Sequence, residues 1–198
     1  MNKKAFISLM VVVLGLGVFG CAGEKGMIKT APSQILPVKV TVDSVERLNA
    51  VAAKPPYQAT DVIVFRVNFR LTNPNNVPAK VDGFDFEGRA EDGTPDNTVL
   101  LAGPMPAIVI PAKEEIMWSW AEPYVFAAMR ASYLYRGVGG KEEGVKGVLK
   151  KVDEFWADLG GDKRKFFVDG NITYSLPDFP KLGTVRNQFK SEFTIPKL

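Results

Sequence analysis

The chain of 198 residues contains no histidine and only one cysteine, Cys21. Without histidine it cannot form a Ser-His-Asp or Cys-His catalytic site, and it has no histidine ligand for a metal ion. A single cysteine cannot close a disulfide within the chain or supply the several thiolates of a structural zinc site. Hydrophobic residues make up 46% of the chain and charged residues 24%, which is typical of a globular protein rather than a disordered one.

The first 20 residues have the pattern of an export signal. Lys3 and Lys4 precede a nearly unbroken apolar stretch from Phe6 to Phe19. Such a stretch, ending at a small residue, is typical of a secretory signal and is short for a membrane span. The step Gly20-Cys21 follows, and it resembles the bacterial lipobox, in which the cysteine becomes lipid-modified and N-terminal after cleavage. The sequence therefore predicts a lipoprotein signal peptide over residues 1–20 and lipid attachment at Cys21. The alternative is an uncleaved N-terminal anchor with an incidental cysteine.

These features predict an exported, lipid-anchored protein. By resemblance to the enterobacterial sorting rule, Ala22 after the cysteine favours the outer membrane where the host has one. Cleavage removes Lys3 and Lys4 and leaves 23 basic and 22 acidic residues, a net charge of +1. A near-neutral chain gives no electrostatic reason to expect a nucleic-acid partner. The expected partners are the membrane, through the lipid, and a protein partner or client proteins. Neither a cofactor nor a small-molecule substrate is indicated.

The rest of the chain is predicted to be a short tether and one β-rich domain. Residues 21–34 comprise the lipidated cysteine and a small, polar, flexible segment. Residues 35–198 have the length of one domain. Their dominant hydrophobic period is two, which predicts about seven short antiparallel strands packed as a β-sandwich. The alternating segments include Val38–Val42, Ile63–Leu71, Phe84–Ala90, Val99–Ala102, Ala107–Ile110, Ile116–Trp120, Phe166–Leu176 with a bulge at Gly170, and Val185–Ile195.

Two segments have helical rather than strand periodicity. Pro123–Tyr135 is the weaker one, and its predicted inner face carries Tyr124, Ala128, Ala131 and Tyr135. The clearer one is Glu142–Leu159, which forms a helical insertion at about residues 141–160 and ends at Gly160-Gly161. Its apolar side either covers an open end of the sandwich or forms a docking face for a partner. The interface residues predicted under the second interpretation are Val148, Val152, Phe155 and Trp156.

The strand that ends at Leu71 runs into Asn73-Pro74-Asn75. Later in the chain come Ile110-Pro111-Ala112 and Val168-Asp169-Gly170. This order resembles the late embryogenesis abundant (LEA) type 2 family, also called the water stress and hypersensitive response (WHy) domain. The resemblance implies an immunoglobulin- or fibronectin-III-like antiparallel β-sandwich with one or two helices near one end. It also implies an association with drying stress, and bacterial members are often exported lipoproteins.

The Asn-Pro-Asn step is interpreted as a structural turn. Pro74 fixes its own backbone and favours extended geometry at Asn73. Asparagine side chains bond to nearby backbone and tolerate left-handed conformations, so Asn75 or Asn76 can turn the chain. A ligand site made of these amides has no support in the sequence.

Carboxylates are the only catalytic groups left to consider. The neighbours Glu114 and Glu115 point to opposite faces of a strand, and Asp82 and Asp85 also differ in parity. Glu142-Glu143 would lie at a helix N-terminus, where negative charge is favourable for structural reasons. No catalytic residue is therefore predicted, although carboxylates could still pair across strands.

The loop after Ala90 is the place where a calcium site has to be considered. Asp92, Thr94 and Asp96 could offer oxygen atoms to the ion, but they match only part of an acidic loop. The sequence therefore predicts no metal site and no cofactor.

Two functions remain. The first is a non-catalytic, lipid-anchored cell-envelope protein that protects surfaces during water loss. The alternative is a lipoprotein subunit or adaptor of an envelope assembly, which binds its partner through the 142–159 helix or a sheet edge.

Overall fold

The computed structural model describes residues 35–50, 54–138, 144–161 and 163–194. The predicted signal peptide, Cys21, the tether over 22–34, Glu142-Glu143 and Ile195 lie outside the described residues. Leu36–Leu198 form one compact unit, to which all the strands and helices named below belong.

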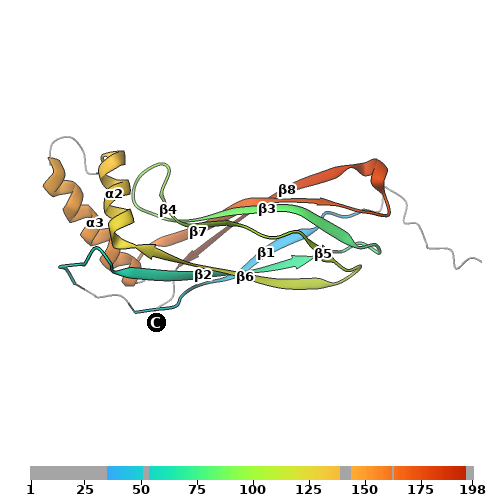
Figure 1. Ribbon diagram of the computed structural model, residues 1–198, viewed down its shortest axis with the longest axis horizontal. Coiled ribbons are helices and arrows are strands. Elements are labelled where there is room, and N and C mark those ends of the chain that lie inside the picture. The colour runs from blue at the N-terminus through green and yellow to red at the C-terminus, as the bar shows by residue number, and fades with distance from the viewer. Residues whose placement is uncertain (1–34, 51–53, 139–143, 162, 195–198) are drawn as a thin grey trace, which may run out of the picture. The chain divides into compact units, whose positions relative to one another are not determined.

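The unit contains two antiparallel β-sheets packed face to face (Figure 1). One sheet has the order β1-β2-β6, and the other has the order β4-β3-β7-β8 with β5 beside β3. If β1 to β4 are taken as strands A, B, C and C′, and β6 to β8 as E, F and G, the sheets read A-B-E and C′-C-F-G. This arrangement confirms the predicted immunoglobulin-like sandwich, with eight strands in place of about seven. The strands are β1 (Lys39–Arg47), β2 (Val62–Thr72), β3 (Ala79–Ala90), β4 (Thr98–Pro104), β5 (Ile108–Ile110), β6 (Glu115–Val125), β7 (Lys165–Ser175) and β8 (Thr184–Thr194).

The core lies between the sheets and follows the alternation of the sequence. Each inward side chain of β2 is fully buried, from Ile63 to Leu71. Phe69 of β2 meets Phe84 of the facing sheet edge to face, with ring centroids 5.2 Å apart. Burying one such large apolar side chain contributes about 1.5–3 kcal/mol. The predicted inner face of this strand is therefore confirmed.

The bulge predicted at Gly170 is wrong. Gly170 pairs in unbroken register with Phe86 on one side and Phe189 on the other. A Cβ atom at this position would lie 2.8 Å from the Phe189 ring and 2.8 Å from the Phe86 Cα. Glycine is needed here because the backbone of β3 approaches closely, with the Asp85 carbonyl oxygen nearest to where a Cβ atom would lie, and not because the strand bends.

Two helices join β6 to β7 and lie together at one end of the sandwich (Figure 1). They are α2 (Phe126–Arg136) and α3 (Gly144–Gly160), and a short 3-10 turn, η2 (Pro180–Leu182), joins β7 to β8. Among the described residues, no helix is long and apolar enough to cross a membrane.

The sequence prediction placed the start and the inner face of α2 incorrectly. β6 continues to Val125, which pairs with Val62, so the helix begins three residues later than predicted. This delay rotates the inner face onto Phe126, Met129 and Tyr133, which are buried. Of the predicted face, Tyr124 lies in β6 and is half-buried, whereas Ala128, Ala131 and Tyr135 are exposed, Tyr135 by 93%.

Candidate functional site

The apolar side of α3 lies in the core of the helical end. Val148, Val152, Phe155 and Trp156 are 6%, 0%, 2% and 0% exposed. Trp156 meets the Phe126 ring at 5.1 Å, and Phe155 meets Tyr133, so α3 packs on α2. The structure corrects the prediction of a docking face on these four residues, because the chain's own side chains already cover them. The other interpretation, in which α3 covers the end of the sandwich, describes the fold.

A buried ion pair fastens α2 to the loop between β3 and β4. The Asp92 side chain is fully buried and accepts a hydrogen bond of 2.8 Å from Nη2 of Arg136. The same carboxylate accepts bonds from the Thr94 backbone and from the hydroxyls of Thr94 and Thr98. Burial alone would raise the pKa of Asp92, but bonds from Thr94, Thr98 and Arg136 outweigh it and leave the pKa lowered.

This ion pair replaces the calcium site considered from the sequence. The Asp92 oxygens already accept bonds from a guanidinium and two hydroxyls, and Asp96 is exposed and forms no bond to them. In the part of the chain that the structure describes, no group of three or more Asp, Glu, Cys or His residues could hold a metal ion.

Two further arginines close the C-terminal end of α3. Arg47, at the end of β1, is 6% exposed and donates from Nη1 to the Leu159 carbonyl oxygen at 2.8 Å. Arg164 binds Asp158 at 2.7 Å and lies over the Phe155 ring. Cations are favourable at a helix C-terminus, where carbonyl groups are left without partners. Sequence reasoning missed Arg47, because its carbonyl partner is 112 residues away along the chain.

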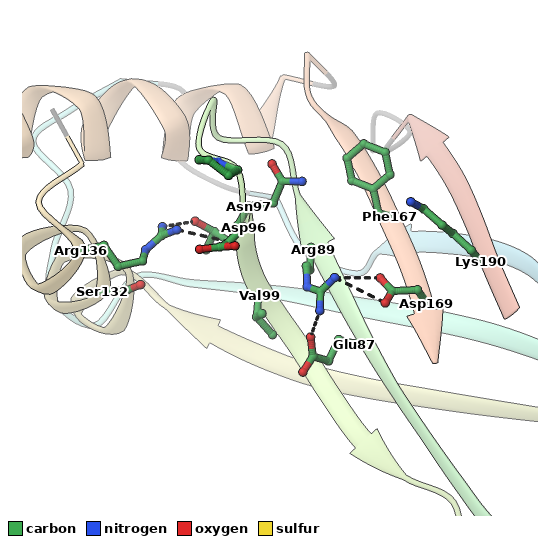
Figure 2. A pocket seen from close by; sticks show the side chains of 12 residues that line it. Glu87, Arg89, Asp96, Asn97, Val99, Ser132, Arg136, Phe167, Asp169 and Lys190 are labelled. Carbon is green, nitrogen blue, oxygen red and sulfur yellow. Dashed lines mark hydrogen bonds and ion pairs between the residues drawn. The ribbon is translucent and has the colours of Figure 1, made fainter. Parts of the chain in front are cut away.

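A polar groove runs from α2 across the outer faces of β3, β7 and β8 (Figure 2). Glu87 and Asp169 are direct cross-strand neighbours in its floor. The Arg89 guanidinium lies between them, with Nη1 3.1 Å from the Asp169 carboxylate and Nη2 bonded to Glu87 (Figure 2). Lys190 follows on β8, opposite Asp169.

The alternation of residues along one strand could not predict this pair of carboxylates, because only the register between β3 and β7 brings Glu87 and Asp169 together. A pair of catalytic carboxyls must reach the reacting bond from either side. Here the space between the carboxylates is filled by a guanidinium, which suits a structural ion-pair network. The acids considered from sequence lie apart: Glu115 binds Arg70, and Asp82 binds Lys80 and Ser175.

The Asn73-Pro74-Asn75 step forms an amide network at the end of the sandwich away from the helices. Asn73 is fully buried, and its Nδ2 donates to the carbonyl oxygens of Val77, Ile110 and Pro111 at 2.8–3.2 Å. Its Oδ1 accepts from the Asn75 backbone and side chain. Asn73 therefore ties the end of β2 to the turn after β5.

Asn75 fixes the entry of the chain into the domain. Its side chain forms a reciprocal pair with the Leu36 backbone, at 2.8 Å and 2.9 Å. The left-handed turn at Asn75 or Asn76 is not observed. Asn97 and Lys113 are the non-glycine residues with positive φ in the described segments, so the chain turns at Asn75 through side-chain bonds.

Comparison with known proteins gives a distant likeness. No family model matches the chain, and no curated protein matches it. Among solved structures, a candidate LEA protein is 14% identical, with 99% of this chain and 87% of that chain covered and a TM-score of 0.42. A candidate ApaA protein from Bordetella pertussis is 12% identical, with 83% and 99% covered and a TM-score of 0.41. A protein from Arabidopsis thaliana is 15% identical, with 88% and 94% covered and a TM-score of 0.36. The chain is thus similar to a LEA-type structure at a coarse level, and these values carry no argument about function.

Proposed function

We propose that this chain is a non-catalytic, lipid-anchored envelope protein whose sandwich domain protects protein or membrane surfaces during water loss. The observation that carries the proposal is the structural position of Asn73-Pro74-Asn75, the motif on which the LEA type 2/WHy resemblance rests. Asn73 and Asn75 form a buried network that joins three segments of one end of the domain. In this proposal the lipid is attached at Cys21 and the protein is exported, to the outer membrane where the host has one.

The surface of the domain suits a role in drying. Many of its charged side chains form ion pairs across neighbouring strands, such as Arg70 with Asp43 and Glu115, and Arg89 with Asp169. Exposed pairs contribute little in water, because water screens them. Coulomb attraction grows as the dielectric constant falls, from about 1 kcal/mol at 4 Å in water to about 4 kcal/mol at an effective constant of 20. Removing water therefore strengthens these pairs and holds the domain folded beside its client.

Protection can be measured on a drying-sensitive enzyme. The enzyme is dried and rehydrated with residues 22–198 of this chain, and beside it with an inert globular protein at equal mass. The proposal expects clearly more recovered activity with this chain than with the inert protein. Recovery equal to that of the inert protein would contradict a protective role.

The anchor needs a separate test in cells. Cys21→Ser should move the protein from the membrane fraction to the soluble fraction and abolish labelling by a fatty-acid analogue, while Ser33→Ala leaves both unchanged. Labelling of the Cys21→Ser chain would contradict lipid attachment at this residue.

The adaptor function keeps one supporting observation. Leu134 and Tyr135 of α2 are 42% and 93% exposed at the helical end, and Val145 of α3 is 64% exposed. A photo-crosslinker at Tyr135, compared with one at the exposed Lys150, tests whether an envelope protein binds there. A specific cross-linked product at Tyr135 that decreases when unmodified domain is added as a competitor would favour the adaptor function over protection.

A further inference from the structure

We infer that the outer edge of β8 pairs with β8 of a second copy, so that two sandwiches join into one continuous sheet. The inference is independent of the lipid anchor and of the protective role. It rests on the free edge of β8 and on the order of the side chains along that strand.

β8 is an edge strand of its sheet, and the start of β1 lies near its middle, where the Asn187 side chain donates to the Val38 carbonyl oxygen. β8 pairs with β7 along one side over all 11 residues, and within the described chain no strand pairs with its other side. Its inward residues are half-buried, whereas the inward side chains of β7 are buried, at Phe166, Val168, Ile172 and Tyr174. A row of unpaired backbone donors and acceptors therefore borders the sandwich at β8.

The other sheet edges carry backbone features that discourage pairing, and the backbone of β8 does not. β6 contains Pro123, β1 has an irregular register between Val42 and Ser44, and β4 is short with a register shift opposite Gly88. In β8 the pairing with β7 is unbroken, no proline interrupts the strand, and no charged residue points inward. Proline, bulges, inward charges and edge lysines are the usual protections of an edge strand, and of these β8 has one lysine, Lys190, on its outer face.

The charge order of β8 is self-complementary. In an antiparallel pair, directly opposed residues share a face of the sheet, and side chains alternate between faces along each strand. A two-fold axis between two copies of one strand must therefore pass beside a residue, which then lies opposite itself, and not between two residues. Centring on Phe189 overlaps the whole strand, Thr184 to Thr194, with its copy. This register places Arg186 opposite Glu192 of the second copy, and the pair occurs twice because of the two-fold axis. Oppositely charged cross-strand neighbours stabilise an antiparallel pair, and like charges destabilise it.

Neighbouring registers lack this match. A centre at Gln188 puts Arg186 opposite Lys190, and a centre at Lys190 puts the two Lys190 side chains face to face. The register with the greatest overlap is thus also the register with complementary charges. In such a dimer the Leu36 residues, where the two chains enter their domains, lie at opposite ends.

Two charge variants test the inference with an internal control. In a dimer of Arg186→Glu chains, the introduced carboxylate faces the carboxylate of Glu192 twice. In a dimer of Glu192→Arg chains, the introduced guanidinium faces the guanidinium of Arg186 twice. A mixed dimer of the two variants places opposite charges together without a further substitution. The side chains of Arg186 and Glu192 are both on the outer face of the sheet. Glu192→Arg also removes the ion pair with Lys165 within the monomer, and thermal unfolding of the variant checks whether this loss destabilises the domain.

The self-association constant of residues 22–198 is measured by sedimentation up to about 1 mM, the effective concentration that tethering can give. We expect a dimer of the unmodified chain, about tenfold to a hundredfold weaker association of each variant alone, and recovery in the equimolar mixture. An unmodified chain that stays monomeric at about 1 mM overturns the inference. Variants that associate like the unmodified chain also overturn it, as does a mixture that gains nothing.

Disulfide trapping tests the register itself. Because Cys21 is absent from residues 22–198, a mixture of Gln188→Cys and Lys190→Cys chains has no other thiol. Opposed residues lie about 4.5–5.5 Å apart, within the range of a disulfide. The mixture should form heterodimeric disulfides, and a mixture of Gln188→Cys and Thr194→Cys chains should not. Equal trapping in both mixtures would overturn the proposed register.

Discussion

The two ends of the sandwich are closed by different chemistry. At the helical end, aromatic side chains of α2 and α3 and a buried Asp92–Arg136 ion pair hold two helices over the core. At the other end, the neutral amides of Asn73 and Asn75 join the β2–β3 turn, the turn after β5 and the start of the domain. Charged closure depends on protonation, whereas amide closure does not. The comparison therefore predicts that acid loosens the helical end first.

The largest effect is expected from Trp156→Ala at the helical end. Trp156 is fully buried against Phe126, and removing such a side chain costs about 3–5 kcal/mol. The free energy of unfolding in urea measures the loss. Tyr135→Ala, on the exposed side of α2, is the matched control and should change stability by less than about 0.5 kcal/mol. Equal effects of the two variants would mean that the helices do not close the core.

At the opposite end, Asn73→Ala should cost about 2–4 kcal/mol, because two buried carbonyl groups and one partly buried carbonyl group lose their donor. The exposed neighbour Asn76 supplies the control, and Asn76→Ala should leave the urea midpoint nearly unchanged. The loss at Asn73 should be the same in neutral solution and in acid. A loss that vanishes in acid would contradict the amide account of this end.

Asp92→Asn should cost about 2–3 kcal/mol at neutral pH, because a partly buried guanidinium loses its charged and fully buried partner. The pKa of Asp92 is lowered in the folded protein, so its contribution is full above the unfolded pKa of about 3.9. The contribution is lost as pH falls through the lower folded pKa. Unfolding free energies of the two proteins should thus converge in strong acid. A difference that stays constant with pH would show that the charge of Asp92 is not what stabilises this end.

The smallest effect is expected from Tyr133→Phe. Burial raises the pKa of the Tyr133 phenol more than the nearby Thr98 hydroxyl lowers it, and among the described residues its hydroxyl makes no hydrogen bond of good geometry. Removing a buried hydroxyl without a partner should leave stability unchanged or raise it by up to about 1 kcal/mol. Thermal unfolding measures this shift, and a loss above about 1 kcal/mol would indicate an unrecognised partner of the hydroxyl.

Strand alternation made most of the sandwich predictable. The inner residues of β2 and β7 were predicted correctly because one face of each strand is apolar. The register between β3 and β7 was not predicted, because no local sequence pattern encodes which residues of two strands lie opposite each other. The same limit hid the Glu87–Arg89–Asp169 network. The phase of α2 was missed because β6 continues through Pro123 to Val125, and pairing with Val62 overrides the helical pattern.

The contacts that close the two ends of the sandwich were not equally predictable from the sequence. The Asn-Pro-Asn turn carries a local motif, so its place at the end of β2 was predictable. The Asp92–Arg136 pair joins residues 44 apart, and Arg47 reaches a backbone carbonyl that has no sequence signature. Long-range polar contacts of this kind depend on the finished fold.

Retention of the fold without water is the central physical claim. The direct measurement is the infrared amide I spectrum of residues 22–198 while a film of the protein is dried and rehydrated. The account predicts that the antiparallel β-sheet band of the hydrated domain persists in the dry film and is unchanged after rehydration. Conversion to a disordered or intermolecular-sheet band on drying would contradict it.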